Sequence, residues 1–390
     1  MRRMPAYLDF AATTPLDDRV LERMLPYLKE DFGNPSSVHS WGQRAEWAVE
    51  DARQRIADGL GCQPEEVIFT SGGSESDNLA LRGAAFDARA SRAADHLLVS
   101  PVEHDAIGNT ALDLAKGHGF ELEFLPVDEF GRVDPDDLRK SIRSDTAVVS
   151  VIYGNNEIGT INPISALAAI AREQGVPFHS DALQATCQLS TRIEDLGVDL
   201  LSIGAHKFYG PKGVGALYVR DGTPLRAVQT GGSQEQQIRA GTHNVPLIVG
   251  MAHAHEIALT QQEKDASRFR QLRDRIIDGV LDSIPGVRLT GHRELRLPNN
   301  ASFVFERLDG NALLAALDLA GFACSSGSAC KTGDPEPSNV LLALGFEPDL
   351  ALGSLRVSVG RQTTDDEVSD FLDMLRTTVA KLKEPIARSS

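Results

Sequence analysis

Three side chains that can do acid–base or covalent chemistry follow apolar, strand-like runs of the sequence. His104 comes just after HLLVS, Asp181 follows VPFHS, and Lys207 follows DLLSIG. Because the carboxyl ends of parallel strands meet at one edge of a sheet, where α/β proteins bind ligands, the three side chains are predicted to share one site. Taken singly, each has a simpler explanation: a structural histidine, a turn cap and a solvated hairpin lysine.

The turn that carries Lys207 is rich in residues that favour close backbone approach. The stretch GAHKFYGPKGVGALYV, residues 204–219, places Gly210, Pro211 and Gly213 after the lysine, between two strand-like runs. Glycine and proline concentrate where a chain turns tightly or packs closely. We therefore expect Lys207 to be held at the mouth of a sheet, since a mobile surface lysine needs no such surroundings.

A second polar turn, SGGSES at residues 71–76, follows the strand-like VIFT and begins a helical pattern. Backbone N–H groups and the positive end of a helix suit a phosphate group, and Ser74 is predicted to cap this helix. The turn lacks the G-x-x-x-x-G-K-[ST] pattern of a nucleotide-binding loop. A plain helix cap is therefore the alternative to a phosphate site.

Two charged residues need partners if they are buried. A carboxylate at Asp181 requires either a basic side chain or the protonated ring nitrogen of a ligand, which Gln184 could also face. Arg356 interrupts the apolar alternation of SLRVSV. Its guanidinium either points to solvent or clamps a carboxylate with two hydrogen bonds.

The cysteines indicate thiol chemistry. The chain has four, none in a C-x-x-C pair, which argues against a disulfide framework or structural zinc site and fits a reducing cytoplasm. Cys330 lies in ACSSGSACKTGDPEPSN, a loop that we expect to be exposed and reactive, with Lys331 favouring the thiolate. Cys324 follows the apolar GFA, so it is expected to end a strand and pack inside.

The composition narrows the possible partners. With 39 basic and 55 acidic residues among 390, the formal charge is −16, which disfavours nucleic acid and anionic membranes. No apolar run approaches the roughly 18 residues of a membrane span, and MRRMPAYLDF does not read as a secretory signal. We expect a protein without nucleic-acid or membrane partners.

The elements that must position these residues follow two patterns. Between residues 67 and 219 strands alternate with helices, which predicts an α/β domain with a mainly parallel sheet. After Val245 a long helical connection with a charged middle leads to a smaller α+β domain, whose last helix has a capping box at Thr364 and Glu367. The predicted domains are 16–260 and, for the smaller one, 1–15 with 261–390.

A series of motifs in a fixed order resembles one known family. The motifs are YLDFAATTPLD, FGNPSS, TSGGSESDN, EHDAI, NNEIGT, HSDALQ, AHKFYGPKGVGALYV, RAGTHNVP, SSGSAC, EPSNVLLALG and SLRVSVGR. Together they resemble the cysteine desulfurases, pyridoxal 5'-phosphate (PLP) enzymes of the class V aminotransferase superfamily, in the group with the longer cysteine-bearing loop. The resemblance runs nearly end to end. It implies the type I PLP-dependent transferase fold, with a seven-stranded sheet in the large domain, and a homodimer.

The resemblance also implies the cofactor contacts. Lys207 would hold PLP covalently through its amine, Asp181 would pair with the pyridinium nitrogen, and His104 would stack on the ring. The other implied cofactor residues are Gly73, Ser74, Asn156, Gln184, Gly204, His206 and Thr242. Gln184 would bond the ring oxygen, and Thr242 would reach the phosphate from a second subunit.

Substrate contacts and two departures complete this expectation. Asn156 and Arg356 would receive the substrate carboxylate, and Cys330 would take the sulfur, with Lys207 and His104 as the other catalytic residues. Gly204 stands where many relatives have a phosphate-binding serine, so that contact is lost or made by backbone only. Ser74 replaces a common threonine and keeps the hydroxyl.

The implied function is the removal of sulfur from L-cysteine. The products would be L-alanine and a persulfide on Cys330, passed to a sulfur-acceptor protein such as an iron–sulfur scaffold, or used in tRNA or cofactor thiolation. Alternatives are a selenocysteine lyase, an aminotransferase on the same fold and a non-catalytic assembly scaffold. No metal site is expected.

Overall fold

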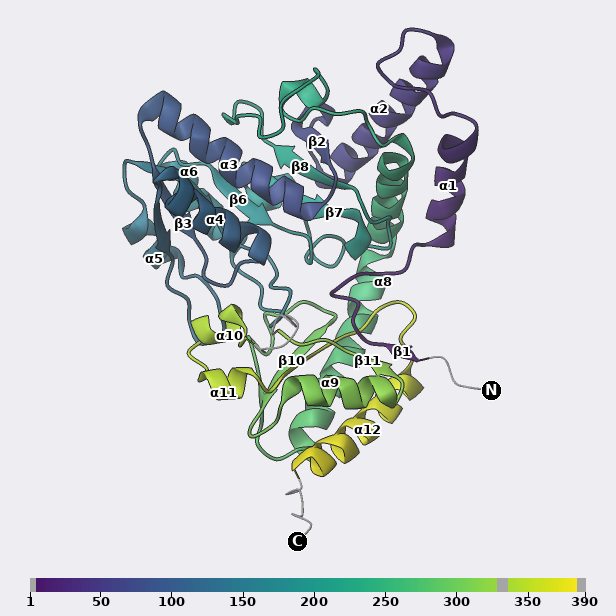
Figure 1. The fold of residues 1–390 in the computed structure, drawn as a ribbon, viewed down its shortest axis with the longest axis vertical. Coiled ribbons are helices and arrows are strands. Elements are labelled where there is room, and N and C mark those ends of the chain that lie inside the picture. The colour runs from purple at the N-terminus through teal and green to yellow at the C-terminus, as the bar shows by residue number, and fades with distance from the viewer. Residues whose placement is uncertain (1–4, 328–335, 384–390) are drawn as a thin grey trace.

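The computed structural model describes residues 5–327 and 336–383. Its larger part is built on a seven-stranded sheet in the order β2-β8-β7-β6-β5-β3-β4 (Figure 1). The strands are β2 Val67–Thr70, β3 His96–Val99, β4 Glu121–Phe124, β5 Thr146–Ser150, β6 Phe178–Asp181, β7 Leu200–Gly204 and β8 Gly215–Val219. In this sheet β8 is antiparallel to β2 and β7, and the other neighbours are parallel. The predicted α/β fold with a mainly parallel sheet is confirmed.

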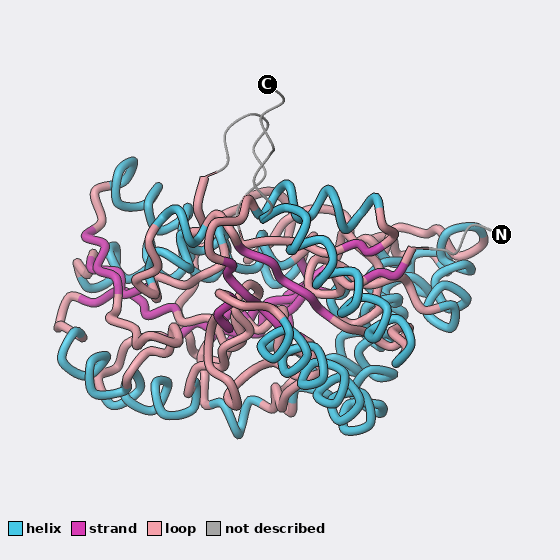
Figure 2. Tube along the Cα trace, turned by 90° about the horizontal axis from the view of Figure 1, so that it is seen from below, coloured by secondary structure: helices cyan, strands magenta, loops and turns pink. Residues whose placement is uncertain are grey.

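Helices cover both faces of this sheet, and the strand sequences show why. Within β2, Val67 and Phe69 enter the core that includes α2, whereas Ile68 enters the core that includes α3. Alternate residues of a strand point to opposite faces, so both faces are apolar. Figure 2 shows the strands running between layers of helices. The helices of this part are α1 Asp18–Lys29, α2 Ser40–Leu60, α3 Gly73–Arg92, α4 Asp105–His118, α5 Pro135–Ser141, α6 Ile164–Glu173 and α7 Ile193–Leu196.

A single long helix, α8 Val245–Ser283, joins the larger part to the smaller one (Figure 1). Residues of its first half, such as Met251 and Ala258, pack in the core beneath the large sheet. Residues of its second half, such as Phe269 and Ile276, pack in a separate core. The predicted helical connection is therefore one continuous helix whose two ends serve different cores.

The smaller part combines two small sheets with helices. One sheet has the order β12-β10-β9, and the other pairs β1 with β11 in parallel. The strands are β1 Ala6–Tyr7, β9 Val287–Leu289, β10 Asn300–Phe305, β11 Phe322–Ala323 and β12 Ser354–Ser358, and the helices are α9 Gly310–Leu319, α10 Asn339–Ala343, α11 Pro348–Ala351 and α12 Asp365–Lys383. Thr364 and Glu367 exchange backbone-to-side-chain hydrogen bonds before α12, so the predicted capping box is confirmed.

The start of α3 differs from the prediction. The helix begins at Gly73 with Gly72 as its N-cap residue, and Ser74 lies inside the first turn. The prediction that Ser74 caps α3 is wrong, because Gly72, at φ 155°, lets the chain turn before Ser74 is reached. The backbone N–H of Ser71 instead donates a hydrogen bond to Glu75 Oε2 at 2.7 Å.

The described residues contain no helix of the length and apolar character needed to cross a membrane. Among the same residues, no group of three or more histidine, cysteine or acidic side chains is placed to hold a metal ion.

Candidate active site

The carboxyl edge of the large sheet borders a cavity of about 390 Å³. Strand β6 ends at Asp181, and β7 leads into the short helix η2 (Ala205–Lys207) that ends at Lys207. The lining residues are Ala11, Ala12, Gly73, Ser74, His104, Ile152, Asn156, Asp181, Leu183, Gln184, His206, Lys207 and Arg356. The predicted histidine, acid and lysine are thus brought together, because each lies at or just beyond the carboxyl end of a parallel strand.

Lys207 is not a solvated hairpin lysine. Its Nζ donates to the carbonyl oxygens of Ala11 at 2.7 Å and Ala12 at 2.9 Å. Burial, and then the positive charge of Arg356, lower the pKa of Lys207 to about 8. More of this amine is therefore neutral near physiological pH than in an ordinary lysine, and the neutral form is the one that acts as a nucleophile or a base.

Asp181 is buried, with 3% of its surface exposed, and one of its oxygens accepts from the backbone N–H of Leu183 at 2.8 Å. Within residues 5–327 and 336–383 it forms no ion pair with a basic side chain. Burial raises the pKa of Asp181, although His104 and Lys207 oppose that rise. The sequence left two partners open for Asp181, a basic side chain or a protonated ring nitrogen of a ligand. The structure favours the second, a cationic atom of a ligand bound in the cavity.

Two further acids lie buried near Asp181, and the sequence analysis did not single them out. The geometry of the described residues gives no close hydrogen-bond partner to the carboxylate of Asp77 or to one oxygen of Glu103. Burial, and then the charge of Asp181, raise the pKa of both well above the usual range. The motifs SESD and EHD contained these acids, but no local pattern shows that they are buried.

Two histidines flank the cavity. The Nδ1 of His104 accepts from the backbone N–H of Ala106 at 3.1 Å, so this ring caps α4 and is held in one orientation. The Nδ1 of His206 lies 3.2 Å from Thr13 Oγ1. Burial, and then Lys207, lower the pKa of His206 to about 4, so it is neutral at physiological pH.

Gly73, the first residue of α3, packs closely against Leu183. A Cβ atom on Gly73 would lie 2.0 Å from Leu183 Cδ2. Gly204 lies beside this turn, since a Cβ on it would be 3.7 Å from the backbone nitrogen of Gly73. Gly204 itself does not line the cavity, so it offers at most a backbone contact there.

Arg356 also lines the cavity, and it is 7% exposed and therefore does not point to solvent. Its guanidinium donates to the carbonyl of Asn156 at 2.9 Å and pairs with Asp9 at 2.8 Å. Its buried Nε has no partner among the described residues. An anionic ligand group could take this free donor or displace Asp9.

The N-terminal segment contributes contacts that the sequence analysis did not assign. The carbonyl of Ala11 accepts from both Lys207 and Gln184, the latter at 2.7 Å. Backbone carbonyls carry no residue signature, and the motif LDFAATTPLD was only part of the resemblance. Its side-chain clue was Asp9, the partner of Arg356.

Thr242 and Cys330 are the remaining predicted site residues. Thr242 is exposed and does not line the cavity. Cys330 lies outside the described residues, but both described ends of its segment approach Glu157, which follows the cavity residue Asn156. Ser338 Oγ donates to Glu157 Oε2 at 2.5 Å, and a Cβ on Gly327 would lie 2.3 Å from that oxygen.

The buried and polar groups of the cavity fit PLP. They offer a nucleophilic amine at Lys207, a buried carboxylate without an ion pair at Asp181, and a helix N-terminus at Gly73. These match the aldehyde, the ring nitrogen and the phosphate of the cofactor in chemical type.

Comparisons with known proteins show the family of the chain. The model of the aminotransferase class-V family matches residues 6–371. The chain is 48% identical to a cysteine desulfurase IscS of Dictyoglomus turgidum, over 97% of this chain and 95% of that protein. It is 45% identical to the cysteine desulfurase IscS of Methanosarcina thermophila, over 97% and 92% of the two chains.

Solved structures point the same way. A NifS-like protein superposes with a TM-score of 0.90 at 35% identity, covering 97% of this chain and all of that one. A structure of SspA in complex with cysteine has a TM-score of 0.80 at 34% identity, covering 92% of this chain and all of that one. The enzymes of this family depend on PLP. The chain belongs to the class-V aminotransferase family and, within it, to the cysteine desulfurases.

Proposed function

We propose that this protein is a PLP-dependent cysteine desulfurase that converts L-cysteine to L-alanine and carries the released sulfur as a persulfide on Cys330. The observation that carries the proposal is one cavity that combines the low-pKa amine of Lys207 with the unpaired buried carboxylate of Asp181. When bound, PLP withdraws electrons from the α-carbon of an amino acid.

The cofactor residues are assigned by their positions in the cavity. Lys207 would hold the cofactor, Asp181 would keep a proton on its ring nitrogen, and His104 would cover one ring face. The remaining contacts come from Gly73, Ser74, Asn156, Gln184 and His206, with Gly204 behind the phosphate end.

Lys207 would also move protons. A pKa of about 8 allows its amine to accept a proton from the substrate α-carbon and to return one. Arg356 would hold the substrate carboxylate together with Asn156, and its free Nε is available for that bond.

Cys330 would take the sulfur as a thiolate. Its Sγ attacks the substrate sulfur, an S–S bond forms, and the C–S bond breaks with its electron pair left on the three-carbon fragment. That fragment gains a proton and leaves as alanine. The outer sulfur of the persulfide would pass to a sulfur-acceptor protein such as an iron–sulfur scaffold, as the IscS relatives suggest.

The proposal also includes the oligomeric state, the location in the cell and the domain division. A homodimer would bring the exposed Thr242 to the phosphate end of the partner's site, and a cytoplasmic location follows from the cysteine content. We also keep the division into 16–260 and 1–15 with 261–390, which the two cores on either half of α8 support.

The assignment of Cys330 is tested by mass spectrometry. The PLP-loaded protein is mixed with L-cysteine, the persulfide is trapped by alkylation, and the modified residue is identified. Sulfur on Cys330 is expected, since burial raises the pKa of Cys324 and keeps that thiol protonated. Modification of Cys324 would overturn the assignment.

Cys330→Ser provides the matching functional test. The absorption of bound cofactor should still change on addition of L-cysteine, while alanine formation falls by two orders of magnitude or more, on the order of 3 kcal/mol in the barrier. Undiminished turnover would remove Cys330 from the mechanism. Retained activity on selenocysteine alone would favour the selenocysteine lyase.

A further inference from the structure

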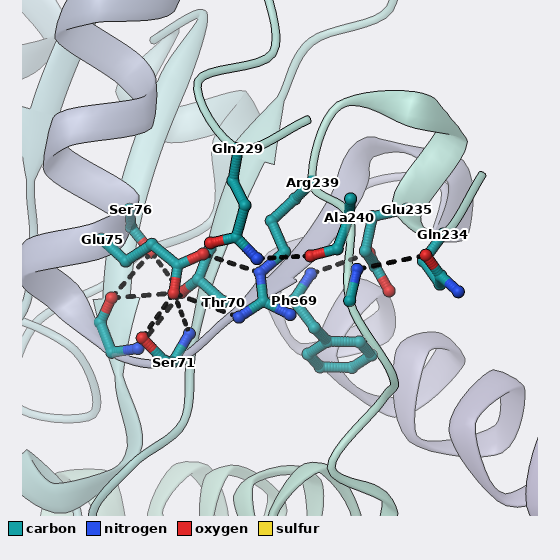
Figure 3. Close-up of polar contacts among 12 residues, drawn as sticks. Phe69, Thr70, Ser71, Glu75, Ser76, Gln229, Gln234, Glu235, Arg239 and Ala240 are labelled. Atoms are coloured by element: carbon teal, nitrogen blue, oxygen red, sulfur yellow. Dashed lines mark hydrogen bonds and ion pairs between the residues drawn. The ribbon is translucent and has the colours of Figure 1, made fainter. Parts of the chain in front are cut away.

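Residues 229–243, here called the strap, connect the region after β8 to α8 and carry Thr242. Glu235, Gln236 and Gln237 have φ values of 45°, 56° and 67°. Three consecutive residues other than glycine in the left-handed region are strained, so surrounding contacts must hold them there. Figure 3 shows those contacts between the strap and the turn that begins α3.

The first set of contacts is a buried anchor at Glu235, whose side chain is 1% exposed. Its carboxylate accepts from both terminal nitrogens of Arg53 at 2.8 and 2.9 Å, and from His243 Nε2 at 2.7 Å. The backbone N–H of Phe69 donates to it at 2.8 Å. Phe69 lies in β2, just before the turn into α3, and Arg53 belongs to α2. This anchor therefore fixes the strap to both β2 and α2.

The second set of contacts joins the strap to α3 itself. Arg239 donates to the two carboxylate oxygens of Glu75 at 2.6 and 3.2 Å. The same carboxylate accepts from the backbone N–H and the hydroxyl of Ser71. Glu75 therefore ties the residue before Gly72 to the first turn of α3, and Arg239 holds Glu75 from the other side.

The proposed phosphate site at the start of α3 also holds a negatively charged side chain. Glu75 is an acid in the first turn of α3, the helix end assigned above to the phosphate of PLP. An unpaired carboxylate there would repel a phosphate dianion, since partly buried charges interact through a low effective dielectric. Arg239, whose side chain is 17% exposed, cancels that charge at short range.

We propose that Arg239 is a positioning residue for the cofactor phosphate. It neutralises Glu75 and holds the turn at residues 71–74, while the Arg53–Glu235–His243 anchor keeps the strap in place. The inference rests on the PLP site proposed above and extends it to a segment outside the cavity. Because Thr242 lies three residues beyond Arg239, the same contacts set where the strap presents Thr242.

The test is a double-mutant cycle read by PLP affinity. Apoprotein is titrated with PLP, and binding is followed by equilibrium dialysis and by absorption. Arg239→Gln should weaken PLP binding roughly tenfold, because it leaves the negative charge of Glu75 uncompensated near the phosphate. Glu75→Gln should change binding much less, and the double variant should recover most of the loss. Arg239→Lys should stay near wild type.

Arg143→Gln provides the matched control. Arg143 also forms a two-bond ion pair, with Glu121 at 2.7 and 2.9 Å, but Glu121 begins β4 at the amino edge of the sheet. This variant should bind PLP like wild type. Thermal melts of all apoproteins separate a loss of folding from a loss of affinity.

Each result decides the question. Unchanged PLP affinity in Arg239→Gln would overturn the inference, and so would a double variant as weak as Arg239→Gln, because the arginine would then act on phosphate directly. Wild-type protein that binds no PLP would overturn the proposed function together with this inference. Normal wild-type binding with an unaffected Arg239→Gln would overturn this inference alone.

Discussion

Two buried carboxylates, in the cavity and in the strap, meet opposite environments. Asp181 is 3% exposed and Glu235 is 5% exposed, so the two residues are similarly buried. Glu235 has four hydrogen bonds from Arg53, His243 and Phe69. Within the described residues, Asp181 accepts one hydrogen bond, from the backbone N–H of Leu183.

The difference appears in their protonation. Burial raises the pKa of both groups, but hydrogen bonds from Arg53 and His243 outweigh it and lower the pKa of Glu235 to about 2. At Asp181 burial prevails and the pKa is raised. A fully satisfied buried acid stabilises the fold, whereas an incompletely satisfied one is suited to bind a cationic ligand group.

Among the variants that test this comparison, the largest effect on activity is expected at Asp181. Asp181→Asn should reduce alanine formation from L-cysteine by about three orders of magnitude, roughly 4 kcal/mol, because the ring nitrogen loses its counter-charge. The melting temperature of the apoprotein should not fall, since an unpaired buried carboxylate is costly. A strong loss of stability with nearly normal turnover would assign Asp181 a structural role.

Glu235 should show the reverse. Glu235→Gln leaves Arg53 without its buried counter-charge and should lower the free energy of unfolding by about 3 kcal/mol, measured with denaturant. Glu50→Gln is the control, because Glu50 also contacts Arg53 but is 58% exposed, and its loss should cost under about 1 kcal/mol. Equal losses in the two variants would contradict the role of burial.

The pH dependence of that effect follows from the lowered pKa of Glu235. A folded-state pKa of about 2 lies below the value of about 4.3 in an unfolded chain. The stabilisation is therefore complete above the unfolded value and is lost as the pH falls from about 4.5 towards 2. The difference in stability between wild type and Glu235→Gln should shrink over that window.

Lys207 sharpens the comparison from the basic side. Its folded-state pKa of about 8 lies below the ordinary value of 10.5, so protonation destabilises the folded apoprotein. Lys207→Met should be more stable than wild type by roughly 2 kcal/mol below pH 8, and this advantage should disappear as the pH rises towards 10.5. An advantage that does not vary with pH would indicate packing instead of charge.

The smallest effect is expected from adding one donor to the incompletely satisfied region. Gly204→Ser should strengthen PLP binding by about fivefold, roughly the worth of one hydrogen bond. The gain is limited because the new Cβ would lie 3.3 Å from Leu183. Titration of the apoprotein with PLP measures it, and weaker binding would show that the site has no room for the hydroxyl.

Much of the fold follows from local patterns. Strand ends at Asp181 and Gly204 and the capping box at Thr364 were predictable, since alternation and capping depend on near neighbours. The start of α3 was not, because Ser74 has the right side chain for a cap and only the φ of Gly72 moves the cap earlier.

The sequence by itself determined which residues carry reactive groups and that several of them follow strands, because residue type and short-range periodicity are local properties. Only the tertiary structure decided which buried acid is satisfied. Glu235 takes its donors from Arg53 and Phe69, which are 182 and 166 residues away, and Lys207 bonds to Ala11, 196 residues away. Charge and pKa depend on such distant neighbours, and no local pattern contains them.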